Sequence, residues 1–243
     1  MIDPQLPWEP SAAPSQPART APLRRPPTEL AVAVIVLAWV WVAWLVVLGF
    51  AGDASEETWR VAVDRGLSYD DTDPTVFDAA YLPVRLYLVA VLVVASLWLH
   101  QSRRFAEALG VGHRFRLSIV WTWLGWVVPL LQLWFPALAV SDVWRATLRR
   151  RLGWVLLPWW GCWLVMLWLS WTAEGWRGGV LGGDVLQDEV LVVSESYVFA
   201  AILAAISCWA WTVIVLRVRR AQLDLASAEF GAPPTSNDVG RRR

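Results

Sequence analysis

The feature that most constrains this chain is one unbroken apolar run, LAVAVIVLAWVWVAWLVVLGF, over Leu30–Phe50. A helix needs about 20 apolar residues to cross the ~30 Å hydrocarbon core of a bilayer. A buried helix of a soluble protein rarely stays apolar on every face for so many turns. The run therefore predicts a membrane-spanning helix, because it is longer than the roughly 7–15 apolar residues of a cleaved signal peptide.

Other apolar stretches have a similar length, at about residues 82–100, 154–172 and 190–216. The stretch 118–140 is also apolar, but it carries Pro129, Gln132 and Pro136. Composition agrees with a membrane protein, since 57% of the 243 residues are hydrophobic. We predict an all-α fold, an integral membrane helical bundle of four transmembrane helices plus a Pro-broken re-entrant or interfacial segment.

The positions of the arginines favour re-entry of 118–140 over a complete crossing. Positive residues close to spans collect on the cytoplasmic side. If 118–140 enters and leaves on one side, the loop arginines left outside are Arg60, Arg65 and Arg177, together with the acidic loops 51–80 and 173–189. If it crosses, arginines divide between both sides. We therefore expect four spans with both termini in the cytoplasm; a kinked but complete third span is the alternative.

Proline chemistry points the same way for 118–140. Each proline removes a backbone donor and clashes with the preceding turn, so a continuous helix through Pro129 and Pro136 is disfavoured. Broken backbone at membrane depth is tolerated where protein or water covers it. We expect a turn there and a returning amphipathic helix, 137–151, in the headgroup region. Its predicted apolar face carries Val140, Trp144, Leu148 and Leu152, and its polar side carries Asp142, Arg145 and Arg149. The helix is expected to end at the basic cluster Arg149, Arg150 and Arg151.

The two ends of the chain have the composition of disordered tails. Residues 1–29 are rich in proline, and residues 221–243 are polar and end in Arg241–Arg243. Such segments bury too little apolar surface to fold. The predicted organisation is a cytoplasmic tail 1–29, a membrane domain 30–220 and a cytoplasmic tail 221–243.

A set of short motifs resembles a known family. They are Arg103-Arg104-Phe105-Ala106-Glu107-Ala108-Leu109-Gly110, Gly125-Trp126, Pro129, Leu133-Trp134, Pro136 and Trp144-Arg145-Ala146-Thr147. Their order is similar to that in domain of unknown function 4328 (DUF4328), found in actinobacterial membrane proteins. The likeness covers about Leu30 to Arg220 and implies an architecture but no activity. Where similar proteins tend to have Asn this chain has Phe105 and Gln132, and Phe135 stands where Arg is frequent.

Arg85 and Glu195 are ionisable residues within predicted spans. Charge inside a membrane is costly, so such residues are candidates for function. Each lies about one turn from the external end of its span, so the two could pair. The alternative is that each side chain reaches the nearby interface.

Nothing in the sequence indicates catalysis or a bound cofactor. The motifs G-x-S-x-G and H-E-x-x-H and the Walker glycine–lysine loop do not occur. Cys162 and Cys208 lie in apolar stretches, where thiols are usually inert. In the loop 51–80, Asp73 followed by Pro74 is typical of a helix N-cap rather than of a calcium loop. We expect no enzyme, no cofactor and no metal site.

Two hypotheses for function follow. The first is a plasma-membrane interaction or scaffold protein whose basic cytoplasmic face, with Arg149–Arg151, engages anionic lipids, a membrane-protein partner or further copies of itself, but no nucleic acid. The second is a small oligomeric transporter or channel in which the broken segment, with Gln132, lines a pathway. Too few polar residues occur in the spans to favour the second.

Overall fold

The structure is a computed structural model that describes residues 25–68, 71–109, 114–126, 128, 130–177 and 193–231. Within these ranges the secondary structure is helical, as the apolar runs predict. The elements are α1 (Thr28–Asp64), α2 (Val76–Tyr81), α3 (Val84–Ala108), α4 (Trp121–Leu124), the 3₁₀ turn η2 (Leu131–Leu133), α5 (Phe135–Leu148), the 3₁₀ turn η3 (Gly153–Val155), the π turn η4 (Leu157–Gly161), α6 (Cys162–Arg177) and α7 (Val193–Gly231).

Four helical stretches in the described part are long and apolar enough to cross a membrane. They are Thr28–Asp64, Val76–Ala108, Gly153–Thr172 and Val193–Ala228. Each coincides with a predicted span, so the all-α membrane fold with four transmembrane helices is confirmed. Residues 118–140 are not among them.

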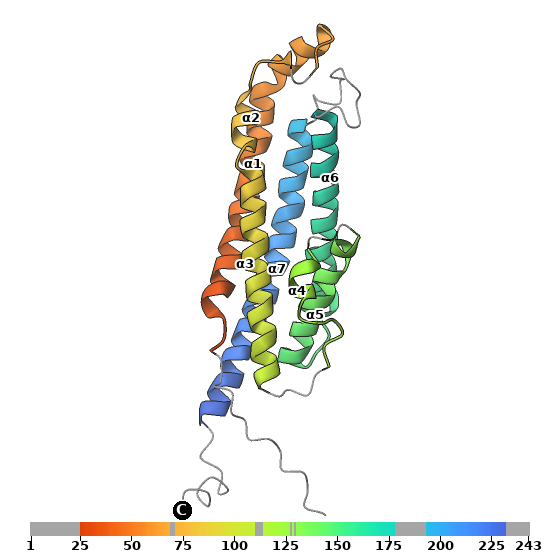
Figure 1. The fold of residues 1–243 in the computed structure, drawn as a ribbon. Helices are drawn as coiled ribbons and strands as arrows, with labels where there is room; N and C mark the ends of the chain where they lie inside the picture. Colours follow the sequence, from red (N-terminus) through yellow and green to blue (C-terminus); the bar gives the residue numbers. More distant parts are fainter. Residues whose placement is uncertain are drawn as a thin grey trace, which may run out of the picture.

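The long helices form an elongated bundle (Figure 1). α1 packs along α7 and α3, and α6 packs on the far side of α7. α5 packs against α3 and α7, beside the half of the bundle in which α3 ends. At about 1.5 Å per residue, the 37 residues of α1 and the 39 of α7 greatly exceed a ~30 Å hydrocarbon core. These two helices therefore extend beyond the apolar layer, at opposite ends of the molecule.

The described ends of the chain differ from the predicted tails. Thr28 and Glu29 already belong to α1, and α7 continues through residues 221–231, so the prediction that these residues are disordered is wrong. Burial explains the extension: Gln222 and Ala226 are buried, and the Gln222 side-chain amide donates to the Ser102 carbonyl oxygen at 3.3 Å. A tertiary contact to α3 thus stabilises a helix that composition alone does not predict. Residues 1–24 and 232–243 lie outside the described ranges.

Glycines allow α1 and α7 to approach closely near one end. A Cβ atom on Gly49 would lie 3.1 Å from Val198 Cγ2, and one on Gly52 would lie 3.2 Å from Ser194 Cα. Small residues at helix contacts are typical of membrane bundles, where close packing replaces the hydrophobic effect. These two glycines fix the separation of the two longest helices.

α2 covers the part of α1 that extends beyond its apolar run. Its N-cap is Thr75, whose hydroxyl accepts a hydrogen bond from the Asp78 backbone N–H while Asp78 accepts one from the Thr75 N–H at 2.8 Å. This capping box, and not Asp73 as predicted, begins the helix. Phe77 then packs on Trp59 and Tyr197, with ring centroids 5.6 and 5.4 Å apart.

Candidate functional site

Exposed arginines gather at the end of the bundle where α3, α5 and α7 finish (Figure 1). The exposed carboxylates Asp53, Glu57 and Asp64 of α1, and Asp71 and Asp73 before α2, belong to the opposite end, whereas Glu29, Glu107 and Asp224 are the exposed carboxylates near the arginines. The bundle therefore has a basic end and an acidic end, an asymmetry along its long axis. We define the basic end by Arg104, Arg149, Arg150, Arg151, Arg217 and Arg220.

A buried arginine holds the chain that follows α3. Arg103 is 9% exposed, and its Nη1 donates to the Leu117 carbonyl oxygen at 2.7 Å. Its Nε donates to Glu107 Oε1 at 2.9 Å, and its guanidinium lies 4.4 Å from the centre of the Phe115 ring. Hydrogen bonds from a charged donor and a cation–π contact both strengthen in a partly buried place. Arg103 is thus a structural anchor beneath the exposed basic residues.

A second anchor joins the stretch before α4 to α5. Arg116 donates from its backbone N and from Nε to the two carboxylate oxygens of Asp142, at 2.9 and 2.7 Å. Its Nη2 donates to Ser141 Oγ at 2.6 Å. Asp142 is 2% exposed. The prediction that Asp142 lies on an exposed polar face is therefore wrong: the carboxylate faces Arg116, which compensates its burial.

The remaining predicted residues of this helix divide into buried and exposed groups. Trp144 is buried and Arg145 is partly buried, and within the described ranges neither the Trp144 Nε1 nor the Arg145 Nε has a partner. Arg149 ends α5 in the left-handed conformation, at φ 54°. Arg149, Arg150 and Arg151 are all exposed. α5 runs from Phe135 to Leu148, against 137–151 as predicted.

Residues 118–140 do not form one helix. α4 ends at Leu124, η2 makes a single turn, and α5 begins at Phe135 with Pro136 in its first turn, where a missing N–H is tolerated. Pro129 lies outside the described residues. The chain packs tightly at Gly125. A Cβ there would lie 2.7 Å from the Trp121 oxygen and 3.0 Å from Phe135 Cβ, so a side chain does not fit. Whether the segment enters a bilayer stays a prediction.

A cavity of about 280 Å³ lies among α1, α3, α6 and α7, and the broken segment closes part of it. Aromatic rings supply much of its wall. Gln132, a predicted candidate, lines the cavity together with Ser207 and Cys208. The lining tryptophans are Trp41, Trp126, Trp159, Trp160, Trp163 and Trp211.

Hydrogen bonds near this cavity tie irregular turns together. The Trp160 Nε1 donates to the Leu133 carbonyl oxygen at 2.7 Å, which joins η4 to the broken segment. The Ser207 hydroxyl donates to the Trp159 carbonyl oxygen at 2.7 Å. A π turn leaves backbone groups without their usual helical partners, and such turns are frequent at functional sites. The sequence predicts a regular helix from Trp154, but this stretch begins with the irregular turns η3 and η4.

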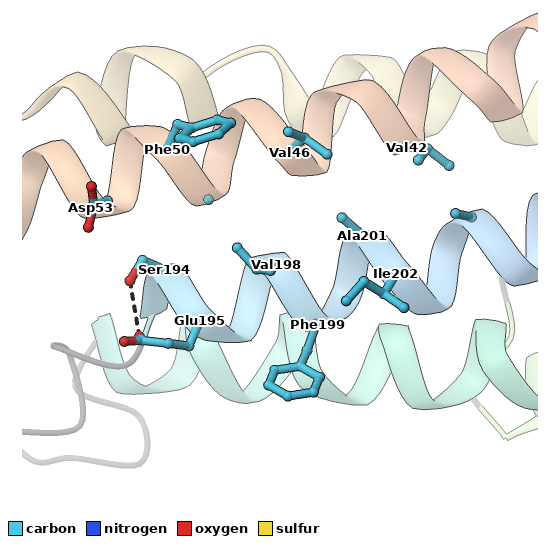
Figure 2. Close-up of a pocket in the computed structure, with 12 residues that line it drawn as sticks. Val42, Val46, Phe50, Asp53, Ser194, Glu195, Val198, Phe199, Ala201 and Ile202 are labelled. Carbon is cyan, nitrogen blue, oxygen red and sulfur yellow. Dashed lines mark hydrogen bonds between the residues drawn. The ribbon is translucent and has the colours of Figure 1, made fainter.

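An open groove of about 670 Å³ runs along α1 and α7 toward the acidic end. Figure 2 shows Asp53 of α1 opposite Ser194 and Glu195 of α7, with apolar side chains along the rest of the groove. The Ser194 hydroxyl donates to Glu195 at 3.0 Å. Such an apolar surface suits the acyl chains of a bilayer. The polar residues of the groove, Asp53, Ser194 and Glu195, are confined to its acidic end.

Arg85 and Glu195 are not brought together. Trp44 Nε1 of α1 donates to the Ala80 carbonyl oxygen at 3.2 Å, which places Ala80 beside Trp44. From there α3 runs toward the basic end, so Arg85 lies no closer to the acidic end than Trp44 does. Glu195 lies near Gly52, which is about 12 Å from Trp44 along α1 at about 1.5 Å per residue. Both charged side chains are exposed, and neither makes an ion pair with any described residue.

The sequence missed two parts of this arrangement. The Arg116–Asp142 pair joins residues distant in sequence, and its one signal was a single carboxylate in a helix with no other acidic residue. Trp41 and Trp163 lie within apolar spans, and no sequence pattern shows that both line a cavity. Among the described residues no group of three or more His, Cys, Asp or Glu side chains could hold a metal ion.

Comparison with known proteins gives one match. The family model of DUF4328, a domain of unknown function, matches residues 69–220, which is more than half of the chain. Neither a curated protein nor a solved structure matches. The matched region holds the basic anchors, the broken segment and three walls of the cavity. Because the match spans α2 through most of α7, the chain belongs to the DUF4328 family.

Proposed function

We propose that the protein is a membrane interaction or scaffold protein whose basic end binds the headgroups of anionic lipids. The observation that carries the proposal is the gathering of exposed arginines from α3, the chain after α5, and α7 at one end of the bundle. Each arginine near an anionic surface contributes about 1 kcal/mol of attraction. The Arg103 and Asp142 contacts join the stretch before α4 to α3 and α5, and the Gln222 contact joins α7 to α3, which supports a defined binding face.

The proposed orientation follows from the same charges. Positive residues near spans stay on the cytoplasmic side, so the basic end faces the cytoplasm of a plasma membrane and both termini lie there. The acidic end, with α2, then faces outward. We propose no catalytic activity. Further copies of the chain or another membrane protein are the partners that a scaffold of this kind would bring together.

Native mass spectrometry of the full chain in mixed micelles tests the proposal. The variant Arg149→Glu/Arg150→Glu/Arg151→Glu should retain phosphatidylglycerol at least tenfold less strongly than the unmodified chain, with retention of phosphatidylcholine unchanged. The control variant, Arg60→Glu/Arg65→Glu, changes exposed arginines at the acidic end and should retain phosphatidylglycerol normally. Equal losses in both variants would show that net charge acts without a defined face.

The alternative, a small oligomeric transporter or channel, has one observation in its favour. The cavity lies beside the broken segment, and Gln132 lines it. No charged side chain lines this cavity, which argues against a path for ions. In that case Gln132→Leu would abolish flux across vesicles, whereas the arginine substitutions would spare it.

A further inference from the structure

The cavity among α1, α3, α6 and α7 lies beside the centre of the apolar run of α1. Ala38 and Trp41 of α1 line it, close to the centre of the charge-free run over residues 30–50. Leu88 and Leu92 of α3 and Ala204 of α7 form other parts of its wall. A ligand would therefore reach it from the membrane. At about 280 Å³ it is slightly smaller than the roughly 300–1,000 Å³ of drug-sized ligand pockets, so it fits a small ligand.

The walls define the chemistry that the cavity accepts. Its lining is apolar and aromatic, with no charged side chain. An ion would lose its hydration without compensation, so the occupant must be neutral. Trp159 stacks on Trp211 with ring centroids 5.2 Å apart, and such flat indole faces pack well against a ring.

Polar groups around the cavity have unused hydrogen-bonding capacity. Trp41 is 7% exposed, and neither its Nε1–H nor that of Trp126 has an acceptor among the described residues. The side-chain amide of Gln132 also makes no hydrogen bond to a described residue. A buried donor without a partner is unfavourable, and an acceptor on a ligand would remove this penalty. The Ser207 hydroxyl is already engaged with Trp159.

We propose that this cavity binds a neutral, apolar ring compound of the membrane that carries a carbonyl oxygen. The ring packs against the tryptophans, and the carbonyl accepts hydrogen bonds from the Gln132 amide or the free indole N–H groups. An acyl chain alone would leave those donors unpaired. This site is separate from the basic end, and either proposal can fail alone.

Photo-crosslinking with benzophenone, a neutral aromatic ketone, tests the site in the full chain reconstituted in nanodiscs. Adducts located by mass spectrometry should concentrate on cavity residues such as Leu88 and Leu92, and not on the exposed Leu86 or Leu130. Unlabelled fluorenone should compete roughly fivefold better than fluorene, which has the same ring system without the oxygen. Adducts spread over the exposed residues, or equal competition by the two compounds, would overturn the proposal.

Matched variants separate binding in the cavity from general partitioning into lipid. Ala38→Phe fills the cavity and should remove the cavity adducts, whereas Ala43→Phe, at an exposed position of the same helix, should leave them unchanged. Gln132→Leu should keep the adducts but reduce the advantage of fluorenone over fluorene. Retention of phosphatidylglycerol at the basic end should be normal in all three variants. Persistence of the cavity adducts in Ala38→Phe would contradict the proposal.

Discussion

Asp142 shows how one carboxylate can fix a chain that has no regular secondary structure. Both of its oxygens accept hydrogen bonds from Arg116, one from the backbone and one from the side chain. The turn that carries Arg116 is therefore held against α5 by a paired, buried charge. A carboxylate at 2% exposure without such a partner would be strongly unfavourable.

We predict that Asp142→Asn lowers the free energy of unfolding by about 1–3 kcal/mol. The loss should be smaller than the roughly 3–5 kcal/mol for breaking a fully buried pair, because the Arg116 side chain is 41% exposed and water can solvate it. Thermal unfolding in detergent measures the change. Asp224→Asn, at an exposed position of α7, is the control and should leave the Tm unchanged. An unaltered Tm in Asp142→Asn would show that Arg116 does not anchor the segment.

Gly125 is a second position where one atom decides the local fold. An added Cβ would lie 2.7 Å from the Trp121 carbonyl oxygen, which is backbone and cannot move aside as a flexible side chain does. Gly125→Ala should therefore destabilise the protein by about 1–3 kcal/mol. Gly161→Ala is the matched control, since its nearest contact is 3.9 Å away, and it should be neutral or slightly stabilising. Denaturant unfolding of the two variants makes the comparison.

Among the elements, the broken segment has the most consequence for topology. If residues 118–140 return to the side from which they came, the chain before α4 and the chain after α5 face the same compartment. In a background with Cys162 and Cys208 replaced by Ser, single cysteines Ser118→Cys and Arg150→Cys should both react with a membrane-impermeant maleimide added from the cytoplasmic side. Asp71→Cys should react only from the other side. Opposite accessibility of positions 118 and 150 would establish a complete third crossing.

The sequence predicted these elements unevenly, for physical reasons. Spans such as 30–50 were predictable because length and hydrophobicity alone determine them. Periodicity also predicted α5, but it placed Asp142 outward, because a sequence pattern assigns polar residues to solvent and cannot show a partner such as Arg116. The helical residues 221–231 were missed for the same reason, since the Gln222 contact to Ser102 joins distant parts of the chain.

At the scale of the whole molecule, the charge distribution and the lengths of α1 and α7 distinguish the same two ends of the bundle. α1 extends past its apolar run at the acidic end, and α7 extends past its own at the basic end. The glycines of α1 hold these two helices in contact where they overlap. A molecule built in this way differs chemically at its two membrane surfaces, so its orientation in the bilayer determines which partners it meets.

Reporter fusions test that orientation. A fluorescent protein that folds only in the cytoplasm should be bright when fused after Arg243, because four spans return the chain to the side on which it began. The same reporter inserted after Ser68, in the acidic loop, should be dark at equal protein abundance on immunoblots.

Exchanging Arg103 for Glu would not be informative, because that side chain also anchors the fold. Reversing the exposed Arg149–Arg151 to Glu should instead raise the misoriented fraction. A dark fusion after Arg243 would place the C-terminus outside and require five crossings, which contradicts both the orientation and the proposed basic cytoplasmic face.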